Sequence, residues 1–391
     1  MSIAVSADFA EEVSEAGPTQ IWDDLSRNVY CVLGSPIDAI DMRGLITAID
    51  NAATHKRRLL ISTVNLNFLM NSRSDPEFRN TLLLSELCSA DGAAVVWIAR
   101  LIGLPIKERV AGSDLFESLG TRGAAAPRLK LFIFGGPDGV AKAAAKALNE
   151  SQCGLTCVGY LYPGYGDVED MSQERIIAEI NDSRADFLVA ALGAQKGQSW
   201  LARNNDRLTV PIRAHLGASI NFAAGKIQRA PALLRRLGLE WLWRIKEEPH
   251  LWRRYWHDGR KLLGLLLTQI IPLAALERWA HFYERVWPKL QIECAADQTP
   301  LSLDLSGTAT RRNVQIASAR FRDLAAPNRT IRINLAKTSM IDARFLGLLL
   351  MLNKQVKKRD AELVFTGASY LLRAIFCLNG AGFLLERSEG V

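Results

Sequence analysis

From residue 28 to residue 225, short runs of apolar residues alternate with amphipathic segments of helix length. Strands that are apolar throughout and separated by helices are typical of a parallel sheet covered on both faces. The pattern therefore predicts an α/β fold with a Rossmann-like parallel sheet. Strands are expected at 28–34, 59–65, 130–136, 155–161, 185–193 and 210–218, and two of the helices at 42–53 and 75–87.

An open α/β sheet binds its ligands at the carboxyl ends of the strands. Polar residues and glycines gather at those ends and are candidates for ligand binding: Thr63, Asn65, Gly135, Gly136, Gly193, Lys196, Gly217 and Asn221. Gly135 and Gly136 begin a GGPDG turn that opens a helix. Its N–H groups could meet a phosphate, but ordinary strand-to-helix turns also use glycine.

One carboxylate, Asp91, stands with Gly92 directly ahead of a long apolar helical run. An aspartate at this position commonly caps the helix, because its oxygens accept hydrogen bonds from the free N–H groups of the first turn. The alternative is a catalytic role. A carboxylate near Thr63, Asn65 and Arg109 could take a proton from a hydroxyl group while the cation stabilises a departing phosphate.

Beyond residue 225 the pattern changes. Residues 226–261 hold ten Lys or Arg against four Asp or Glu, and 262–276 is an apolar run that Pro272 is expected to break. Apolar pairs recur at helical spacing, flanked by Arg253, Arg254, Arg260 and Lys261. The apolar run is too short to span a bilayer, so we expect a basic amphipathic appendage at 226–279 that lies in an anionic membrane surface. Packing on the sheet or on a second subunit is the alternative.

The rest of the chain divides into three parts. Residues 300–391 show three strands, each followed by a helix, which predicts a small separate α/β domain. Residues 280–299 are expected to be a linker. The acidic residues 1–27 lack a basic segment followed by an apolar one, so we expect a flexible tail without a secretory signal.

The net charge of +7 points to an anionic partner, which could be nucleic acid, a phosphorylated substrate or a lipid surface. The six cysteines stand in apolar runs without the spacing of a metal site, as in a reduced cytoplasmic protein. The sequence has no Asp-x-Asp pair and no histidine cluster, so neither a metal nor a cofactor is predicted. Arginine, lysine and backbone N–H groups would then neutralise a phosphate leaving group.

Several segments, in this order, resemble the WecG/TagA/CpsF family of bacterial glycosyltransferases: ISTVNLNF, SADGAAVVWIARLIG, ERVAGSDL, FIFGG, GYLYPGYG, ALGAQKGQSW, HLGASINFAAGKIQRAP and LGLEWLWRIKEEPHLWRRYW. The resemblance covers roughly residues 28–255. It implies the GT-E fold and inverting, metal-independent transfer of a sugar to a polyprenyl-diphosphate-linked saccharide at the cytoplasmic membrane. The donor would be a UDP-sugar, of the UDP-glucuronic acid or UDP-N-acetylmannosamine type.

The resemblance makes Asp91 the base that deprotonates the acceptor hydroxyl, with Thr63, Asn65 and Arg109 around the substrates. It implies that the basic appendage closes over the site, with Arg244, Arg253 and Arg254 facing phosphates. The matching segments further suggest these substrate-binding residues: Gly135, Gly136, Tyr160, Gly193, Lys196, Gly217, Asn221 and Arg229.

One motif departs from the family pattern. Where the family usually has Gly-x-Pro-Lys-Gln-Glu, this chain has Gly-Ala-Gln-Lys-Gly-Gln at 193–198, so Gly197 replaces the usual glutamine. We expect Gln195 or Gln198 to supply the missing amide, and Lys196 to face a diphosphate or the carboxylate of a uronic acid.

The C-terminal segments LSLDLSG, INLAKTSMIDARFLGLLL and VFTGAS resemble a STAS domain. Active phosphoswitches of this type carry a serine after the aspartate of the central loop, where this chain has Asp342 and Ala343. Phosphorylation is therefore not expected, since alanine has no hydroxyl group. A role in protein docking or self-association is expected instead.

Together these features favour a peripheral glycosyltransferase of exopolysaccharide or capsule synthesis at the cytoplasmic face of the bacterial inner membrane. The alternative is a catalytically weak scaffold that recruits polysaccharide enzymes through the STAS-like unit. A Rossmann oxidoreductase is disfavoured because the full glycine fingerprint is missing. Nucleic acid is not an expected partner, because the basic residues accompany a leucine-rich stripe and no DNA-reading motif.

Overall fold

The computed structural model describes residues 23–122, 127–151, 154–225, 230–283, 288–295, 301–324 and 330–386. Its largest sheet has six strands in the order β4-β3-β8-β7-β5-β6, and every neighbouring pair is parallel. This confirms the predicted Rossmann-like α/β fold. The strands are β3 (Leu59–Val64), β4 (Leu87–Ala90), β5 (Leu129–Gly135), β6 (Leu155–Leu161), β7 (Phe187–Ala191) and β8 (Ile212–His215).

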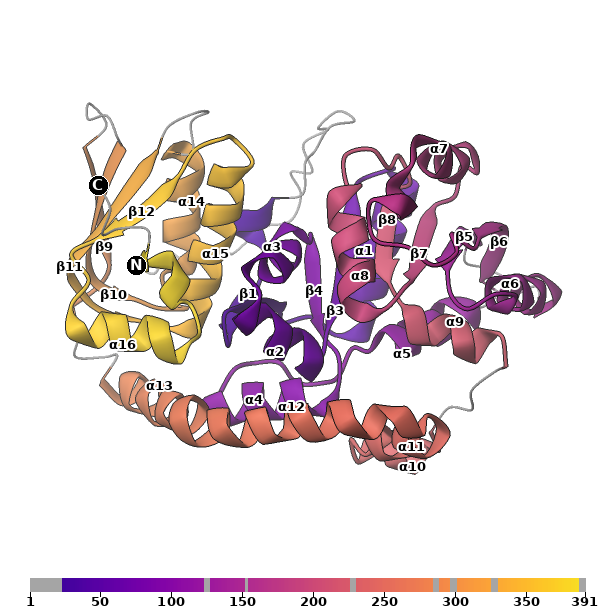
Figure 1. Cartoon of the computed structure of the whole chain (residues 1–391). Helices are drawn as coiled ribbons and strands as arrows, with labels where there is room; N and C mark the ends of the chain where they lie inside the picture. The colour runs from indigo at the N-terminus through magenta and orange to yellow at the C-terminus, as the bar shows by residue number, and fades with distance from the viewer. Residues whose placement is uncertain are drawn as a thin grey trace, which may run out of the picture.

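Helices cover both faces of this sheet (Figure 1). One face packs against α1 (Met42–Thr54), α5 (Gly112–Gly120), α6 (Val140–Ser151) and α9 (Gly217–Ala223). The other face packs against α7 (Glu174–Asp182) and α8 (Ala194–Arg203). Around the edge formed by β4 lie α2 (Leu66–Ser74), α3 (Pro76–Leu84) and α4 (Ala93–Ile102). Burial on both sides explains why the strands are apolar throughout.

The prediction of one helix at 75–87 was wrong at its end. Asp75 does cap α3, because its Oδ1 accepts the N–H of Phe78 at 3.0 Å and Pro76 occupies the first turn. The helix ends at Leu84, however, and β4 follows at once. A four-residue apolar strand directly after a helix cannot be distinguished from another helical turn by periodicity.

The strand predicted at 28–34 does not join the large sheet. It forms an antiparallel hairpin, β1 (Val29–Val32) with β2 (Ser35–Asp38). Leu33 and Gly34 have φ of 49° and 86°, and two consecutive positive values are typical of the tightest hairpin turn. A Cβ on Gly34 would lie 2.4 Å from the carbonyl oxygen of Gly380, so this turn also packs against the C-terminal unit.

A continuous helical segment of 32 residues, Pro249–Ala280, runs along one side of the molecule (Figure 1). It contains η3 (Pro249–Leu251), α12 (Trp252–Leu265), the π-helical turn η4 (Leu266–Ile270) and most of α13 (Ile271–Tyr283). Pro272 does not break it, contrary to expectation. The N–H of Ile271 bonds to the carbonyl of Leu266, five residues back, and this wider turn accommodates the proline ring.

The apolar run expected to be too short to span a bilayer is part of this longer helix, which could cross a membrane by length and composition. In the structure it lies against the protein. The apolar pairs separate into two rows along it. The first members, Leu251, Leu262, Leu266 and Ile270, are buried or pack against the core. The second members are 47 to 65% exposed: Trp252, Trp256, Leu263, Leu267 and Ile271. We call these five residues the exposed row.

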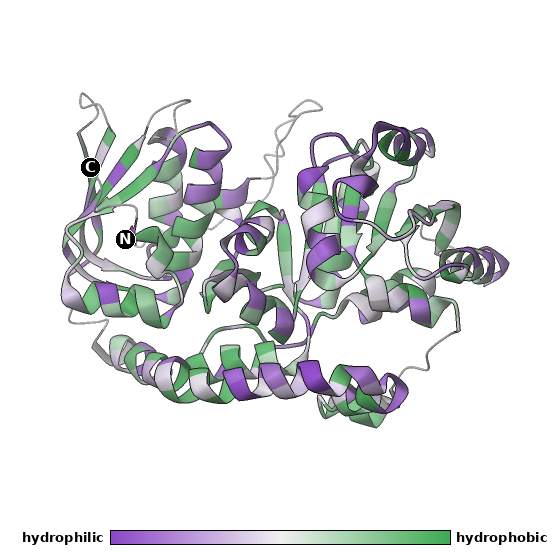
Figure 2. Ribbon diagram, in the orientation of Figure 1, coloured by the Kyte–Doolittle hydropathy of each residue, from purple (hydrophilic) through white to green (hydrophobic). Residues whose placement is uncertain are grey.

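Figure 2 shows hydrophobic and hydrophilic residues alternating along the same helix. The packing interpretation therefore holds for one row of apolar residues. The other row remains uncovered by the described parts of the chain, and it has the exposed apolar surface that the membrane interpretation requires.

The C-terminal unit has a four-stranded sheet in the order β12-β11-β10-β9. Its strands are β9 (Gln291–Ala295), β10 (Leu301–Ala309), β11 (Ile331–Ile341) and β12 (Leu363–Thr366), and its helices are α14 (Val314–Leu324), α15 (Ala343–Lys357) and α16 (Tyr370–Leu378). Strand β9 pairs antiparallel with β10. Residues 291–295, expected within a linker, therefore form the edge of this sheet.

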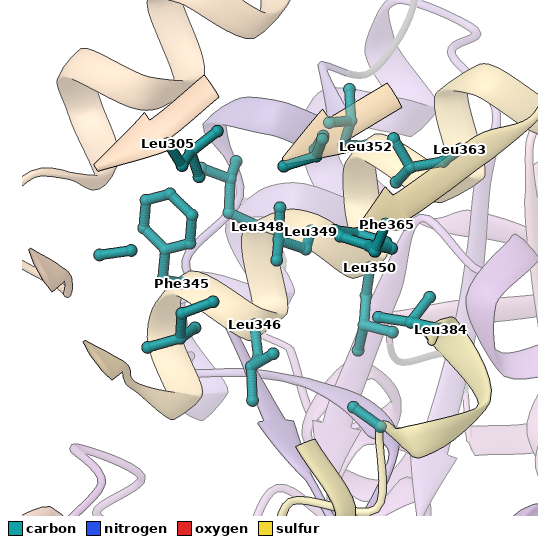
Figure 3. Packing of buried hydrophobic residues seen from close by; sticks show 14 of the residues in the cluster. Leu305, Phe345, Leu346, Leu348, Leu349, Leu350, Leu352, Leu363, Phe365 and Leu384 are labelled. Atoms are coloured by element: carbon teal, nitrogen blue, oxygen red, sulfur yellow. The ribbon is translucent and has the colours of Figure 1, made fainter. Parts of the chain in front are cut away.

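Helix α15 lies between the two halves of the molecule. Figure 3 shows its residues packed with Leu305 and Phe365 of the C-terminal sheet. Every residue from Ala343 to Lys354 is buried. One apolar cluster joins residues of this helix, such as Phe345 and Leu349, to Leu25 and Val29 near the start of the chain. The expectation of a flexible tail at 1–27 was wrong for its last residues, which form the short helix η1 (Asp24–Ser26) packed into this core. Residues 1–22 lie outside the described residues.

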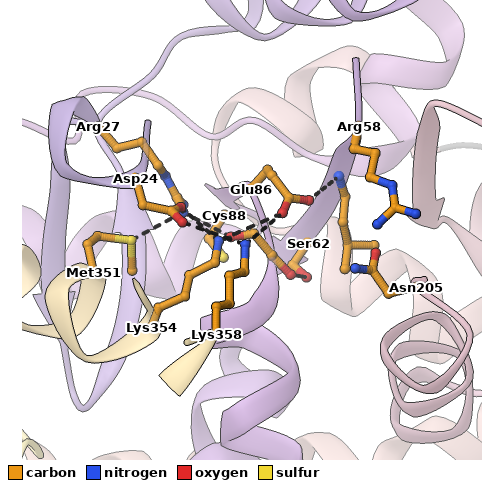
Figure 4. A network of polar contacts seen from close by, with 12 residues as sticks. Asp24, Arg27, Arg58, Ser62, Glu86, Cys88, Asn205, Met351, Lys354 and Lys358 are labelled. Carbon is orange, nitrogen blue, oxygen red and sulfur yellow. Dashed lines mark hydrogen bonds and ion pairs between the residues drawn. The ribbon is translucent and has the colours of Figure 1, made fainter. Parts of the chain in front are cut away.

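A buried network of charges crosses the same interface (Figure 4). Lys354 of α15 lies 2.7 Å from the carboxylate of Asp24 and donates to the carbonyl of Ser85. Arg27 bonds to Asp24 and Asp38, and the Asp38 carboxylate accepts the N–H of Cys88 in β4. Charged side chains thus satisfy backbone groups at the open edge of the large sheet, which protects an edge strand from unwanted pairing.

The loop before α15 is covered from the other side by α13. Asp342 caps α15, accepting the N–H groups of Phe345 and Arg311 at 2.8 and 2.7 Å. Glu277 of α13 accepts the N–H of Ala343 at 3.1 Å. Burial, together with the negative charge of Asp342, raises the pKa of Glu277 to about 8. The position where phosphoswitches carry a serine is therefore enclosed within this chain.

Candidate active site

The neighbouring strands β3 and β4 bring the predicted catalytic residues together. Asp91 directly follows β4, and its N–H donates to the carbonyl of Val64 at the end of β3 at 2.8 Å. Asn65 follows β3 and caps α2, because its Oδ1 accepts the N–H of Phe68 at 3.1 Å. Thr63 is buried one residue inside β3. Their catalytic roles stay predictions, but their common place at one sheet edge follows from the strand register.

Asp91 is not the cap of α4. Gly92 occupies the cap position with φ of 95°, and no side chain caps the helix there. The Asp91 carboxylate instead accepts the N–H of Gly112 and lies in the fields of Arg109, Glu240 and Asp114. Burial is the main cause that raises the pKa of Asp91 to about 6, while Arg109 opposes the shift. A carboxylate with this pKa accepts protons effectively near neutral pH.

Arg109 stands between two carboxylates. It lies 2.5 Å from Asp114 at the start of α5 and forms a further ion pair with Glu240. Because both partners are acidic, the positive charge of Arg109 is already compensated within the protein. The expectation that Arg109 neutralises a departing phosphate is therefore weakened. Its position fits a residue that holds Glu240 and limits the pKa of Asp91.

The segment with α10 (Ala232–Arg236) and α11 (Glu240–Glu247) closes over Asp91. Gly238, with φ of 73°, brings it onto α4, where an added Cβ would lie 2.5 Å from the Cβ of Ala93. Only glycine fits both this backbone angle and this approach. Helix α11 thereby carries Glu240 to Arg109, and Arg244 into the field of Asp91.

Arg244 is the cation that best faces the candidate site. Its Nη2 lies 2.9 Å from Glu248, but its buried Nε has no hydrogen-bond partner among the described residues. Burial opposes ionisation, yet nearby Tyr255, Glu248 and Asp91 raise the pKa of Arg244. A buried, charged N–H group without an acceptor is unfavourable, so a bound anion would stabilise it.

An open pocket of about 520 Å³ adjoins the end of β7. The Nζ of Lys196 donates to the carbonyl of Gly166 at 2.6 Å, and the amide of Gln195 donates to Asp75 at 2.9 Å. Helix α12 contributes Arg254, whose guanidinium lies 5.2 Å from the ring centroid of Tyr255. The pocket is lined by Asn67, Asn71, Asp167, Val168, Gly193, Ala194, Gln195, Lys196, Ser199 and Arg254.

The glycines after β5 serve the backbone. Gly135 and Gly136 have φ of 97° and 86°, and a Cβ on Gly135 would lie 2.7 Å from the side chain of Leu192. The N–H of Gly136 donates to the carbonyl of Ala191 at 2.7 Å, and Pro137 has no N–H. The turn therefore offers a phosphate fewer donors than the motif suggests, and the ordinary-turn interpretation is favoured.

Gln198 does not reach the pocket, so the expectation that it supplies an amide there was wrong. It is fully buried and its amide donates to the hydroxyl of Ser62 at 2.6 Å. Positions 195 and 198 are three residues apart on α8, yet Gln195 lines the pocket while the side chain of Gln198 enters the core. Gln195 remains the candidate for the missing amide.

The other predicted substrate residues differ in position. Gly217 is the first residue of α9, and a Cβ on it would lie 3.1 Å from the carbonyl oxygen of Leu192. Asn221 is half-buried further along the same helix. Tyr160 is exposed on β6, at the sheet edge opposite to Asp91. Arg253 is exposed beside Trp252. Arg229 lies outside the described residues.

Gly197 makes room for a histidine. A Cβ at this position would lie 2.2 Å from Cδ2 of His215, the last residue of β8. The Nε2 of His215 donates to the carbonyl of Leu192 at 2.6 Å, and burial lowers the pKa of His215, which keeps the ring neutral at pH 7. The imidazole of His215 thus occupies the space where the Cβ of the usual glutamine would lie.

Glu240 and His215 were not among the residues predicted from the sequence. Glu240 stands in the quoted segment LGLEW, and an acid directly after a basic, glycine-containing turn was the available signal. No local sequence pattern marked His215, because its role comes from a contact between β8 and Gly197 of α8. Among the described residues, no group of three His, Cys, Asp or Glu side chains is arranged to hold a metal ion.

The chain was compared with known proteins. Residues 30–275 match the model of the glycosyl transferase WecG/TagA/CpsF family, and residues 292–386 match the Mlab-type STAS domain. A relative from Bacillus spizizenii is 28% identical over 194 residues, which cover 50% of this chain and 73% of the relative. A relative from Staphylococcus aureus is 24% identical over 225 residues, covering 57% of this chain and 85% of the relative.

Both relatives are named N-acetylglucosaminyldiphosphoundecaprenol N-acetyl-beta-D-mannosaminyltransferase, as is a third from Bacillus subtilis that is 27% identical over 196 residues, 50% of this chain and 74% of the relative. The family match covers well over half of the chain and includes every strand of the large sheet. The chain therefore belongs to the WecG/TagA/CpsF family of glycosyltransferases, and it carries a STAS domain behind the family's region.

Proposed function

We propose that this enzyme transfers a sugar from a UDP-sugar to a hydroxyl group of a polyprenyl-diphosphate-linked saccharide, with inversion and without a metal ion. The Asp91 carboxylate takes the hydroxyl proton, and the acceptor oxygen attacks the anomeric carbon of the donor. The bond from that carbon to the diphosphate oxygen breaks, and UDP leaves with the electron pair. One face of the donor is attacked once, so the configuration inverts.

The observation that carries this proposal is the environment of Asp91. A carboxylate with a pKa of about 6, released from helix capping and held by the N–H of Gly112, suits a general base. Thr63 and Asn65 lie at the same sheet edge, where they can orient the acceptor hydroxyl.

Cations of the appendage and of α8 would stabilise the leaving group. Arg244 has an unpartnered buried N–H among the described residues, and Lys196 and Arg254 line the pocket at the end of β7. Charge-assisted hydrogen bonds from such groups stabilise the negative charge that develops on a departing diphosphate.

The relatives' names include the transfer of N-acetylmannosamine to an undecaprenol-diphosphate-linked N-acetylglucosamine. A donor of the UDP-N-acetylmannosamine type and an acceptor of this class are therefore the first candidates here. UDP-glucuronic acid remains a second candidate, because Lys196 and Arg254 could face a uronic acid carboxylate. The product would enter exopolysaccharide or capsule synthesis.

The exposed row and its neighbouring arginines support a position at the cytoplasmic face of the membrane. Trp252 and Trp256 are 51 and 65% exposed, and Arg253 and Arg260 are exposed on the same helix. A helix of this kind binds an anionic surface through apolar burial and roughly 1 kcal/mol per basic residue. Such a position would give the site access to a lipid-linked acceptor.

The test is a panel of UDP-sugars offered with a short-chain lipid-diphosphate saccharide, with products identified by mass spectrometry. We expect one donor to give an inverted product at the same rate with and without EDTA. Loss of product in EDTA, restored by magnesium, would contradict the metal-independent mechanism. If no donor gives product while the protein still binds vesicles, a scaffold role would replace the enzymatic one.

A further inference from the structure

A second open groove, of about 370 Å³, lies between α2 and α12, apart from the pocket at the end of β7. Two cations and four uncharged residues line it: Met70, Arg73, Ser74, Lys261, Gly264 and Leu265. No carboxylate is among these lining residues. The groove is therefore a small positively charged site with apolar walls.

Arg73 has no counter-charge in the described part of the chain. It is half-buried in the last turn of α2, and no hydrogen bond or ion pair joins it to another described residue. Burial alone acts on the pKa of Arg73 and lowers it. A half-buried guanidinium without a partner is costly, and an anion in the groove would offset that cost.

The groove opens on the flank of the helix that carries the exposed row. Leu263 and Leu267 are 60 and 64% exposed, and both are close in sequence to Gly264. When a helix lies in a bilayer surface, its apolar row is buried and the basic residues on its flanks lie at the level of the headgroups. Lys261 and Arg73 would then meet the phosphates of that layer.

We propose that this groove binds the headgroup phosphate of a bilayer phospholipid and thereby fixes the orientation of the enzyme on the membrane. The proposal rests on the membrane-surface position proposed above. Arg73 and Lys261 donate to the phosphate oxygens, while Met70 and Leu265 contact the apolar start of the lipid. Gly264 leaves the space that the headgroup needs, because an added Cβ there meets no atom within 4 Å.

The groove and the candidate site lie at opposite ends of α2. Asn65 caps the start of α2 and Arg73 stands in its last turn, eight residues further. At 1.5 Å per residue this is about 12 Å along the helix. In an acceptor with a single sugar, the reacting hydroxyl and the diphosphate are separated by one sugar ring, which is shorter than this length of helix. We therefore assign the phosphate in the groove to a second lipid.

The experiment measures sedimentation of the full chain with two kinds of vesicle. Both have a phosphate-free digalactosyldiacylglycerol matrix with the same density of negative charge, supplied in one by phosphatidylglycerol and in the other by oleate. We expect about tenfold stronger binding to the phosphatidylglycerol vesicles, the factor of a good charge-assisted hydrogen bond. Arg73→Leu and Gly264→Gln should each abolish this preference, the first by removing charge and the second by filling the groove.

Matched controls come from the same helix. Arg260→Leu removes one exposed positive charge that does not line the groove, and should weaken binding to both vesicles equally. Gly259→Gln adds a side chain where a Cβ also meets no atom, and should keep the preference. Sedimentation needs no sugar transfer, so its result remains readable if the proposed enzymatic function fails.

Two results would overturn the proposal. The first is a preference for phosphatidylglycerol that survives in both Arg73→Leu and Gly264→Gln. The second is a raised KM for the short-chain acceptor in these variants without any change in vesicle preference, which would assign the groove to the acceptor diphosphate. Circular dichroism identifies a variant that fails to fold. The vesicle preference of the other variant then tests the proposal.

Discussion

At the scale of single residues, Asp91 shows how a neighbouring glycine changes the chemistry of a carboxylate. Because Gly92 takes the cap position of α4 with a positive φ, the Asp91 side chain is free to face Gly112 and the arginines. The same aspartate as a helix cap would have its pKa lowered by the helix N-terminus. Here burial dominates and raises the pKa to about 6.

The first prediction concerns Asp91→Asn. Turnover should fall by roughly 10² to 10⁴, the usual contribution of a positioned base, with little change in UDP affinity. In the unaltered enzyme kcat should rise with pH up to about 6 and then level off, because the base must be ionised. Steady-state kinetics from pH 5 to 8 would measure both. A variant with normal turnover would remove Asp91 from the mechanism.

The same substitution should not weaken the fold. The folded pKa of about 6 exceeds the ordinary value of 3.8, so the unfolded chain loses this proton first as the pH rises. Ionisation of Asp91 therefore costs the native state stability between about pH 4 and 6, and the loss persists above pH 6. Thermal unfolding at pH 7.5 should show an unchanged or higher Tm for Asp91→Asn. A lower Tm would contradict the buried environment.

The second prediction concerns Gly197 and His215. Gly197→Gln alone places a Cβ 2.2 Å from the imidazole, so the ring must leave Leu192. Overpacking of this kind typically costs about 1 to 3 kcal/mol. Adding His215→Gly should recover most of that loss. Denaturant unfolding of the two single variants and the double variant measures the coupling.

Gly259→Gln is the matched control for this cycle, because the added side chain there meets open space. Additive effects of the Gly197 and His215 substitutions would mean that the two positions do not compete for the same volume. A strong coupling would explain how this chain departs from the usual family motif without losing its fold.

At this scale the sequence predicted where the site residues lie along the sheet, but it did not predict which side chains contact them. Thr63, Asn65 and Asp91 stand at strand ends, so their common edge follows from the parallel register. The two carboxylates that hold Arg109 and the burial of Gln198 depend on tertiary packing, for which the local pattern has no signal. The same holds for His215, which matters only through its contact with Gly197.

At the scale of elements, the long helix serves two surfaces at once. Each apolar pair supplies one residue to the protein and one to the exposed row. Helical periodicity predicted a wide stripe but could not divide it, because neighbouring residues on a helix differ in direction by only about 100°. The division is made by α2 and α4, which cover one side of the stripe.

The third prediction follows from this division. Leu267→Ser, in the exposed row, should weaken vesicle binding and leave the Tm nearly unchanged. Ile270→Ser, in the buried row, should lower stability by about 2 to 5 kcal/mol, because it removes a fully buried side chain and buries a hydroxyl. Vesicle sedimentation and thermal unfolding of both variants would decide. Equal effects of the two variants would contradict two separate surfaces.

At the scale of the whole molecule, the STAS domain is part of the structural core. Its helix α15 covers the hairpin β1–β2, and Lys354 bonds to the edge of the large sheet. The sequence predicted two domains from their separate patterns of strands and helices. It could not show that residues 24–38 lie between the two domains, because the sequence of a short apolar segment does not indicate which helix or strand it packs against.

The fourth prediction tests this integration with two co-expressed pieces, residues 1–283 and 288–391. We expect them to form a stable 1:1 complex on size-exclusion chromatography, because the buried residues of α15 and the ion pairs of Lys354 and Asp24 rejoin. The first piece alone should be aggregation-prone, since the apolar residues that α15 covers would be exposed to solvent. A soluble, cooperatively unfolding first piece would contradict this interface.

The fifth prediction concerns pH. The folded pKa of Glu277 is about 8, above the ordinary 4.5, so its ionisation opposes folding as the pH rises from 4.5 to 8. Glu277→Gln should therefore raise the Tm at pH 8.5, and the gain should vanish towards pH 4.5. Glu293→Gln, on the exposed edge strand β9, serves as control and should show no such trend. A gain independent of pH would mean that Glu277 is ionised in the native protein.

The π-turn at Leu266–Ile270 determines how this helix responds when a residue is added to it or removed from it. It inserts one residue into the helix, which rotates everything after it by about 100°. That rotation brings the buried Leu273 and Glu277 into line with Leu251 and Asp258, about four to seven turns earlier. Deleting one residue within the turn would restore a regular α-helix and keep Glu277 in line with Asp258. Regular α-helical hydrogen bonding without a deletion would instead rotate Glu277 by about 100°, away from the N–H of Ala343.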